Sequence, residues 1–328
     1  MGLVVVMTGC GEKQQNWTSN SNSGGALGTS YNITYLDTEE ANFQKEIDSV
    51  FEVVNQSLST YIPDSDISKI NRGDTLEVDH MFRDVFQLSK SVFEDTDGYF
   101  DPTVGTLVNA WGFGPGQQIQ LDSAKVDSLL DYVGFQKVSL NEKGEIIKEH
   151  PAIQFDFNAV AKGYAIDRLA TMLRDKGIEN FLVEVGGEIV SRGENKLKDK
   201  EWTVGVDDPQ AGDARRLKLA LKLSDKALAS SGNYRKYRID SVSGKKYVHT
   251  IDPKTGFTKN SRVLATSVIA ENCARADAFA TAFMAMDLDC SIALLSKTKD
   301  LDAYIIYLDE EGETQEFFTT GFEERILR

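Results

Sequence analysis

The stretch Phe155-Asp156-Phe157-Asn158-Ala159-Val160-Ala161-Lys162-Gly163-Tyr164-Ala165-Ile166-Asp167 joins a predicted strand to a predicted helix. The helical spacing covers about residues 159–176, and Gly177 follows as a C-cap. A second strand, Phe181-Leu182-Val183-Glu184-Val185, comes next and is closed by Gly186-Gly187. This part of the chain therefore predicts strand, helix and strand in succession.

Outside this stretch the predicted elements do not alternate regularly. Apolar spacing predicts helices near residues 40–58, 81–95, 123–133, 273–286 and 291–297, and strands near 30–36, 303–308 and 314–318. Residues 202–270 are rich in strand patterns, with strict alternation at 217–223. Mixed runs of this kind favour an α+β fold with mixed or antiparallel sheets and packed helices over a doubly wound sheet. We expect one two-lobed domain over residues 26–328.

Composition excludes several partners. The chain has 328 residues, 41% hydrophobic content and a formal charge of -15, with no basic run that could follow a nucleic-acid backbone. Nucleic acid is not an expected partner. No stretch reaches the about 20 apolar residues of a membrane-spanning helix. An acidic protein that handles an anionic ligand needs a metal ion, a helix N-terminus or a few placed cations to neutralise it locally.

The N-terminus has its own pattern. An apolar run at residues 3–9 ends at Cys10, and residues 11–25 are polar and rich in Ser, Asn and Gln. This pattern is similar to the end of a bacterial lipoprotein signal, with Cys10 as the lipidated residue. We expect residues 1–25 to be a signal remnant and a flexible tether; the alternative is a disordered tail with an incidental cysteine. Cys273 and Cys290 are predicted to be buried free thiols, although a disulfide between them is possible.

A single charge interrupts an apolar, alanine-rich helix at residues 276–286. Asp277 lies one turn before Thr281 on the same helix face, so their oxygen atoms can converge on one point. Oxygen ligands suit Mg²⁺ or Ca²⁺. The alternatives are that Asp277 pairs with Arg275 or Lys162, or that it caps the helix.

The junction at residues 155–167 is a candidate phosphate site. Free N–H groups at a helix start favour phosphate, and Lys162 in the first turns can supply a cation. An ordinary junction with Asn158 as N-cap would have the same pattern.

His249 is one of three histidines and follows a predicted strand. Imidazole is well suited to accept a proton near neutral pH, although a lone histidine is more often structural. The following Asp252-Pro253-Lys254-Thr255-Gly256 is a turn by composition alone.

Familiar nucleotide and nucleophile motifs are missing. Gly112-Phe113-Gly114-Pro115-Gly116 lacks the preceding strand and full spacing of a dinucleotide-binding loop. The sequence contains neither GxxxxGK[ST] nor GxSxG.

Many short motifs nevertheless occur in a recognisable order. They are Gly28-Thr29-Ser30-Tyr31, Ser59-Thr60-Tyr61, Ser65-Asp66-Ile67-Ser68, Gly98-Tyr99-Phe100-Asp101-Pro102-Thr103-Val104-Gly105, Trp111-Gly112-Phe113-Gly114, Asp156 to Asp167, Glu184-Val185-Gly186-Gly187-Glu188, Ala229-Ser230-Ser231-Gly232-Asn233-Tyr234, His249 to Gly256 and Ala276 to Thr281. Together they resemble the FAD:protein FMN transferases, the ApbE-type family, over nearly everything after the tether.

The resemblance implies a role for each matched position. Asp277 and Thr281, with the backbone carbonyl of Ala159, resemble Mg²⁺ ligands. His249 is the candidate to accept or relay the hydroxyl proton, with Asp252 orienting the loop. The implied FAD-contacting residues are Leu27, Tyr61, Trp111, Gly112, Phe113, Asp156, Lys162 and Ile251.

The implied reaction moves FMN from FAD to a Thr or Ser hydroxyl of an acceptor protein, with release of AMP. Alternatives are FAD pyrophosphatase activity, which gives FMN and AMP, and FAD binding without catalysis. The resemblance also implies a location in the bacterial cell envelope, held to the membrane through the lipid anchor only and facing the periplasm or exterior.

Overall fold

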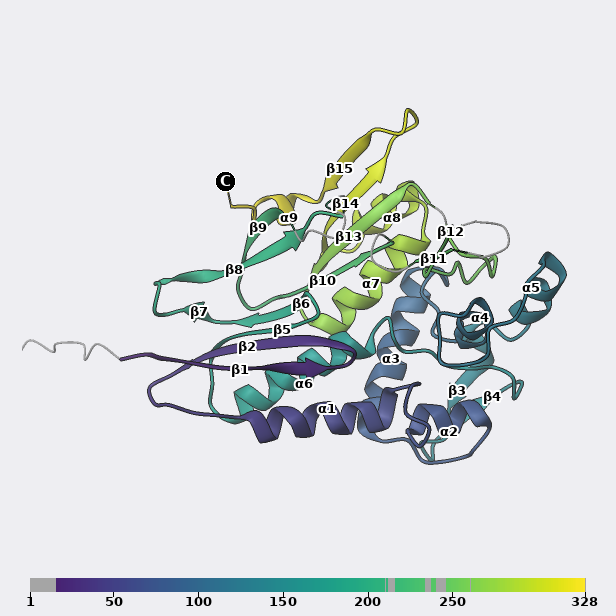
Figure 1. Ribbon diagram of the computed structural model, residues 1–328, viewed down its shortest axis with the longest axis horizontal. Helices are drawn as coiled ribbons and strands as arrows, with labels where there is room; N and C mark the ends of the chain where they lie inside the picture. The colour runs from purple at the N-terminus through teal and green to yellow at the C-terminus, as the bar shows by residue number, and fades with distance from the viewer. Residues whose placement is uncertain are drawn as a thin grey trace, which may run out of the picture.

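Eight strands form one antiparallel sheet at the centre of the molecule (Figure 1). The computed structural model describes residues 16–209, 211, 216–233, 237–239, 246–259 and 261–327. In spatial order the strands are β1 (Thr18–Ala26), β2 (Thr29–Asp37), β5 (Asn180–Val185), β6 (Glu188–Arg192), β10 (Ala227–Gly232), β13 (Val263–Ala270), β14 (Asp302–Leu308) and β15 (Thr314–Phe318). Every neighbouring pair is antiparallel, which confirms the α+β prediction.

A smaller sheet covers one face of the large one. Its strands are β7 (Glu194–Asn195), β8 (Lys200–Asp207) and β9 (Leu217–Leu223). Apolar side chains of β8 and β9 pack against Ile189, Leu228, Ile269 and Ile306 of the large sheet. Two short pairs, β3 (Val138–Leu140) with β4 (Ile146–Lys148) and β11 (Tyr237–Ile239) with β12 (Lys246–Val248), lie outside both sheets.

Helices cover the other face of the large sheet. In chain order the described helices are α1 (Gln44–Leu58), α2 (Asp66–Arg72), α3 (His80–Asp95), α4 (Gly105–Trp111), α5 (Ser123–Leu130), α6 (Ala161–Asp175), α7 (Cys273–Ala285), α8 (Leu288–Leu295) and α9 (Thr320–Glu323), with a 3-10 turn at Phe135–Lys137. The short α9 is an exception, because its Phe322 packs with the smaller sheet. Helix α7 packs against β10 and β13 on one side and against α6 and α3 on the other (Figure 1). It is therefore buried all round, which explains why its sequence lacks a polar face.

The tether prediction is wrong for residues 18–25, because they belong to β1. The side chains of Asn20 and Asn22 are buried and replace the apolar residues expected on the inner face of a strand. Asn20 accepts from the Ala41 backbone N–H at 3.0 Å, and the Tyr35 hydroxyl donates to Asn22 at 3.0 Å. These bonds stabilise a strand whose composition indicates a linker. Residues 1–15, with Cys10, lie outside the described residues.

The strand predicted to end at Asp156 is also wrong. Only Gln154 makes a bridge there, to Val104, and Asp156 lies in the loop before α6. Asn158 does not cap the helix, since the N-cap position is Val160. Helices α2 and α4 were not predicted, because each has only seven residues and too few turns to establish a period.

Cys273 and Cys290 are both free; Cys273 is buried as predicted, whereas Cys290 is exposed. Among the described residues, no helix has the length and apolar character needed to cross a bilayer.

Candidate active site

A cavity of about 1310 Å³ lies where α6, α7 and the ends of several strands meet. Its volume exceeds the range of about 300–1,000 Å³ that is usual for sites of drug-sized ligands, so a dinucleotide fits. The sequence-predicted residues that line it are Leu27, Tyr61, Phe113, Asp156, Ala159, Lys162, His249, Ile251, Asp277 and Thr281. Residues from six separate parts of the chain thus converge on one space.

Helices α6 and α7 cross at Gly163. A Cβ atom at this position would lie 2.5 Å from the carbonyl oxygen of Cys273 and 2.8 Å from the Cα of Ala274. Glycine is therefore needed for the two helices to approach. At the crossing, the Gly163 backbone N–H donates to Asp277 Oδ2 at 3.2 Å. This bond fixes the carboxylate of α7 at the first turn of α6.

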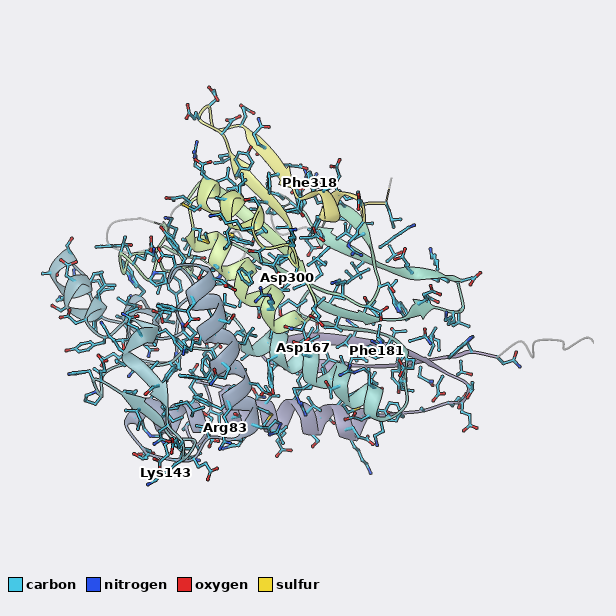
Figure 2. The ribbon with its side chains drawn as sticks, turned by 180° about the vertical axis from the view of Figure 1, so that it is seen from behind. Arg83, Lys143, Asp167, Phe181, Asp300 and Phe318 are labelled. Carbon is cyan, nitrogen blue, oxygen red and sulfur yellow. The ribbon has the colours of Figure 1, made fainter. Side chains whose placement is uncertain are left out.

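Asp167 holds the same two helices together from the other side. Its carboxylate accepts from the backbone N–H groups of Cys273 at 2.8 Å and Ala274 at 2.9 Å, which satisfies the free end of α7. Figure 2 labels Asp167 near this end of α7. Burial raises the pKa of Asp167 to about 7, although the two N–H groups oppose the shift.

A short ion pair in the cavity wall links Lys162 and Glu188. The Lys162 Nζ lies 2.7 Å from Glu188 Oε1, and the Glu188 side chain is only 2% exposed. Burial alone would lower the pKa of Lys162, but the carboxylates of Glu188 and Asp277 raise it overall. Lys162 therefore stays protonated. Glu188 appears in a recognised motif but was not predicted as a site residue, because its partner lies 26 positions earlier in the sequence.

Two buried carboxylates share this one ammonium. Burial raises the pKa of Glu188 and of Asp277, and the charge of Asp277 raises that of Glu188 further. Within the described residues, Glu188 Oε2 has no hydrogen-bond partner. The raised pKa values show that ionising both carboxylates beside a single ammonium is unfavourable, and a bound cation would reduce this cost.

The oxygen atoms at this wall fit a hard cation better than a soft one. Asp277, Thr281 and Ala159 all line the cavity and offer oxygen. The described part of the chain contains no group of three His, Cys, Asp or Glu residues arranged to hold a metal. A cation here would thus need further oxygen ligands from water or from a ligand such as a phosphate.

The loop after β12 brings His249 and Ile251 to the opposite wall. Asp252 is buried and is not among the residues that line the cavity. It accepts from the backbone N–H of Lys254 at 2.9 Å, and the Lys259 ammonium lies 3.5 Å away. These bonds hold the turn at residues 252–256 together, and the loop-orienting role of Asp252 stays a prediction.

Trp111 and Gly112 are likewise not among the residues that line the cavity, and their contact with FAD stays a prediction. The Trp111 Nε1 donates to the Gly256 carbonyl at 2.9 Å, and Gly112 ends α4 in a left-handed conformation. Trp111 thus links α4 to the turn that follows His249. Phe113 alone of this motif lines the cavity.

Leu27, Tyr61 and Asp156 lie at the remaining wall. Leu27 and Gly28 form the two-residue turn between β1 and β2, both with positive φ. The ring of Tyr61 is 59% exposed and is free to stack on a planar ligand. Asp156 accepts from the Asn158 backbone N–H at 2.8 Å, and burial raises its pKa.

These features agree with comparisons to known proteins. A model of the ApbE family matches residues 27–305.

The chain belongs to the ApbE family.

Relatives in the family cover most of the chain. A FAD:protein FMN transferase of Haemophilus influenzae is 31% identical over 305 residues, which is 88% of this chain and 87% of the relative. One from Vibrio cholerae is 32% identical over 311 residues, 92% of this chain and 90% of the relative.

Solved ApbE structures share the fold. The flavin transferase ApbE from Vibrio cholerae superposes with a TM-score of 0.83 at 29% identity, covering 94% of this chain and 100% of that one. The ApbE protein from Thermotoga maritima gives a TM-score of 0.81 at 27% identity, covering 95% and 100%. The ApbE fold thus extends over nearly the whole described structure.

Proposed function

We propose that this protein transfers FMN from FAD to a hydroxyl of an acceptor protein. The named relatives match it over most of their length. The observation that supports the proposal most directly is the buried group of Lys162, Glu188 and Asp277 in the wall of a cavity large enough for a dinucleotide. A cation and an ammonium at this wall would face the pyrophosphate, the most highly charged part of FAD.

Mg²⁺ is the proposed metal, with the Asp277 carboxylate, the Thr281 hydroxyl and the Ala159 carbonyl as its ligands. When bound, it would neutralise negative charge on the pyrophosphate. The unpartnered oxygen of Glu188 and the excess of carboxylates over ammonium groups support a cation at this place.

Other residues would bind and orient the nucleotide. Lys162 would donate to a phosphate oxygen, because Glu188 fixes its ammonium beside the cavity. Tyr61 would stack on a ring, while Leu27, Phe113 and Ile251 supply apolar walls and Asp156 a hydrogen-bond acceptor.

In the proposed reaction, the Thr or Ser oxygen of the acceptor forms a bond to the FMN-side phosphorus. The bond from this phosphorus to the oxygen of AMP breaks, and AMP leaves with the electron pair. His249 would accept the proton of the attacking hydroxyl, and Asp252 would hold the loop in place. Closure of the cavity by the acceptor would exclude water, which otherwise gives FMN and AMP.

The test uses purified protein, FAD, Mg²⁺ and a library of synthetic peptides that each contain one central threonine. Flavin fluorescence that stays on peptide after denaturation, together with AMP release, would support transfer. FMN and AMP without labelled peptide would indicate a pyrophosphatase, and tight FAD binding without turnover would indicate a binding protein. Asp277→Ala should abolish Mg²⁺-dependent transfer. Full activity in Asp277→Ala would contradict the metal assignment, and a His249→Ala variant with unchanged transfer across pH would remove the proposed base.

We further propose that Cys10 bears a lipid that holds the protein to the membrane of the bacterial cell envelope, facing the periplasm or exterior. The apolar run before Cys10 supports this. Metabolic labelling with a fatty-acid analogue should mark the wild-type protein and leave Cys10→Ser unmarked. Equal labelling of both would exclude this anchor.

A further inference from the structure

Strand β10 is paired along its whole length on only one side. Its six residues, Ala227 to Gly232, all pair with β13. On the other side, β6 pairs with β10 only at Ala227 and Leu228. Among the described strands, none pairs with residues 229–232 on that side. Residues 229–232 therefore form an open edge, although β10 lies between two other strands of the large sheet.

The hydrogen-bond pattern shows which backbone groups this edge presents. Asn233 donates its N–H to Leu264 at the β13 side, whereas the Lys226 carbonyl accepts from Ser191 at the β6 side. In an antiparallel ladder, successive residues direct their N–H and C=O groups to opposite sides. Ser230 and Gly232 therefore direct theirs toward the open side.

The edge is open because the β5–β6 hairpin ends early. Gly186 and Gly187 form its turn, with φ of +61° and +94°, so β6 begins only at Glu188. Ser230 is exposed although it lies in a sheet of eight strands. Both the hairpin turn and residues 230–232 line the cavity that holds Lys162 and Asp277.

A protein acceptor has a specific need that this edge meets. The hydroxyl of Thr or Ser is attached to Cβ, so the acceptor backbone must itself enter the cavity for the oxygen to reach phosphorus. Backbone N–H and C=O groups that leave water require new partners. An extended segment obtains them by adding to an open sheet edge.

We propose that the open edge of β10 at Ser230 and Gly232 binds an extended segment of the acceptor protein as an added strand. This inference rests on the proposed transferase function. It identifies how the acceptor is bound: main-chain hydrogen bonds hold the segment in place beside the cavity.

In such an added strand, alternate side chains of the acceptor would lie on opposite faces of the sheet, because successive side chains of a strand point to opposite sides. One face of β10 at this point packs with Ala229 against α7, which bears Asp277. The opposite face is lined by Ile189, Val206 and Ile306. The hydroxyl residue should therefore point to the α7 side, and its two neighbours in sequence should meet apolar walls.

The test uses a peptide from the threonine library that accepts flavin. Single backbone amides of this peptide are N-methylated one at a time, and transfer is measured at a fixed, subsaturating peptide concentration. A strand predicts a period of two, with transfer reduced about tenfold or more at alternate amides and retained at the amides between them. Uniform loss, or no loss, would overturn the proposal. Unmodified peptides that accept no flavin would contradict the transferase function itself.

A pair of protein variants gives an independent measurement. Gly232→Pro removes an N–H from the open edge, whereas Gly232→Ala keeps it. We expect KM for the unmodified peptide to rise about tenfold in Gly232→Pro relative to Gly232→Ala. Circular dichroism establishes that both variants fold; if Gly232→Pro does not, the N-methyl series alone decides. Weakened FAD binding with unchanged peptide KM in Gly232→Pro would assign the edge to the flavin and overturn the proposal.

Discussion

The backbone N–H of Gly163 in α6 donates to the carboxylate of Asp277 in α7 at 3.2 Å. The two residues are 114 positions apart in the sequence. Their contact exists because Gly163 has no side chain to separate the helices. The position of the proposed metal ligand therefore depends on a residue that itself offers no ligand atom.

Gly163→Ala should impair both stability and metal binding. The added Cβ would meet the backbone of Cys273 and Ala274, which cannot rotate away, so we expect a loss of about 1–3 kcal/mol in the free energy of unfolding. Displacement of α7 should also weaken Mg²⁺ binding. Urea unfolding and calorimetric Mg²⁺ titration measure the two effects. Gly25→Ala is the control, since its nearest contact would be 3.7 Å away. Equal behaviour of both variants would contradict the close approach.

Glu188→Gln should weaken FAD binding through Lys162. Without the carboxylate, the ammonium loses the partner that fixes it 2.7 Å away. Loss of such a supporting partner typically reduces affinity roughly 10–100-fold. A double-mutant cycle with Lys162→Met, measured by quenching of FAD fluorescence, should show strongly non-additive effects. Additive effects would show that Glu188 acts independently of Lys162. Glu179→Gln, which removes a surface partner of Arg192, should bind FAD normally.

Asp167 should make the stability of the metal-free protein depend on pH. Its pKa is raised from 3.8 to about 7 in the folded state, so folding disfavours its ionised form. Its contribution to stability is therefore greatest below about pH 4, falls as pH rises to about 7, and is constant above. The free energy of unfolding of wild type minus that of Asp167→Asn should decrease over this window by on the order of 1–3 kcal/mol. Urea titrations in EDTA measure it; a difference that is flat or rises with pH would refute the shift.

Trp111→Phe should reduce FMN transfer through the position of the loop after His249, beyond its effect on the stability of the protein. It leaves the Gly256 carbonyl without its donor, at a cost of about 1–3 kcal/mol, and loosens the turn after His249. We expect FMN transfer to fall more than stability explains. Trp202→Phe removes the comparable bond to the Arg192 carbonyl in the smaller sheet and should destabilise the protein while transfer persists. Similar transfer rates in these two variants would show that Trp111 has only a structural role.

Several site residues could be identified from the sequence because their information is local. Asp277 and Thr281 are one helical turn apart, and a single charge in an apolar helix must have a compensating partner nearby. Lys162 was placed by its position near a helix start. Residue type and position indicated His249, while family resemblance added Ala159, whose backbone carbonyl has no distinctive sequence pattern.

Other features were not visible in the sequence. The Ser- and Asn-rich residues 18–25 have the composition of a linker, and their pairing with β2 and side-chain bonds to residues 35 and 41 stabilise them as β1. Trp111 and Asp252 matched the family pattern, yet neither is among the residues that line the cavity. Local composition does not report contacts of this kind.

The sequence by itself determined the buried helix α7, its carboxylate and its hydroxyl, because helical periodicity follows from neighbouring residues. Only the tertiary structure decided that Glu188 fixes Lys162, that Gly163 allows α6 to touch α7, and that β10 has an open edge beside the cavity. These relationships join residues far apart in the sequence. They depend on where helices cross and where strands stop pairing, which short-range patterns leave undetermined.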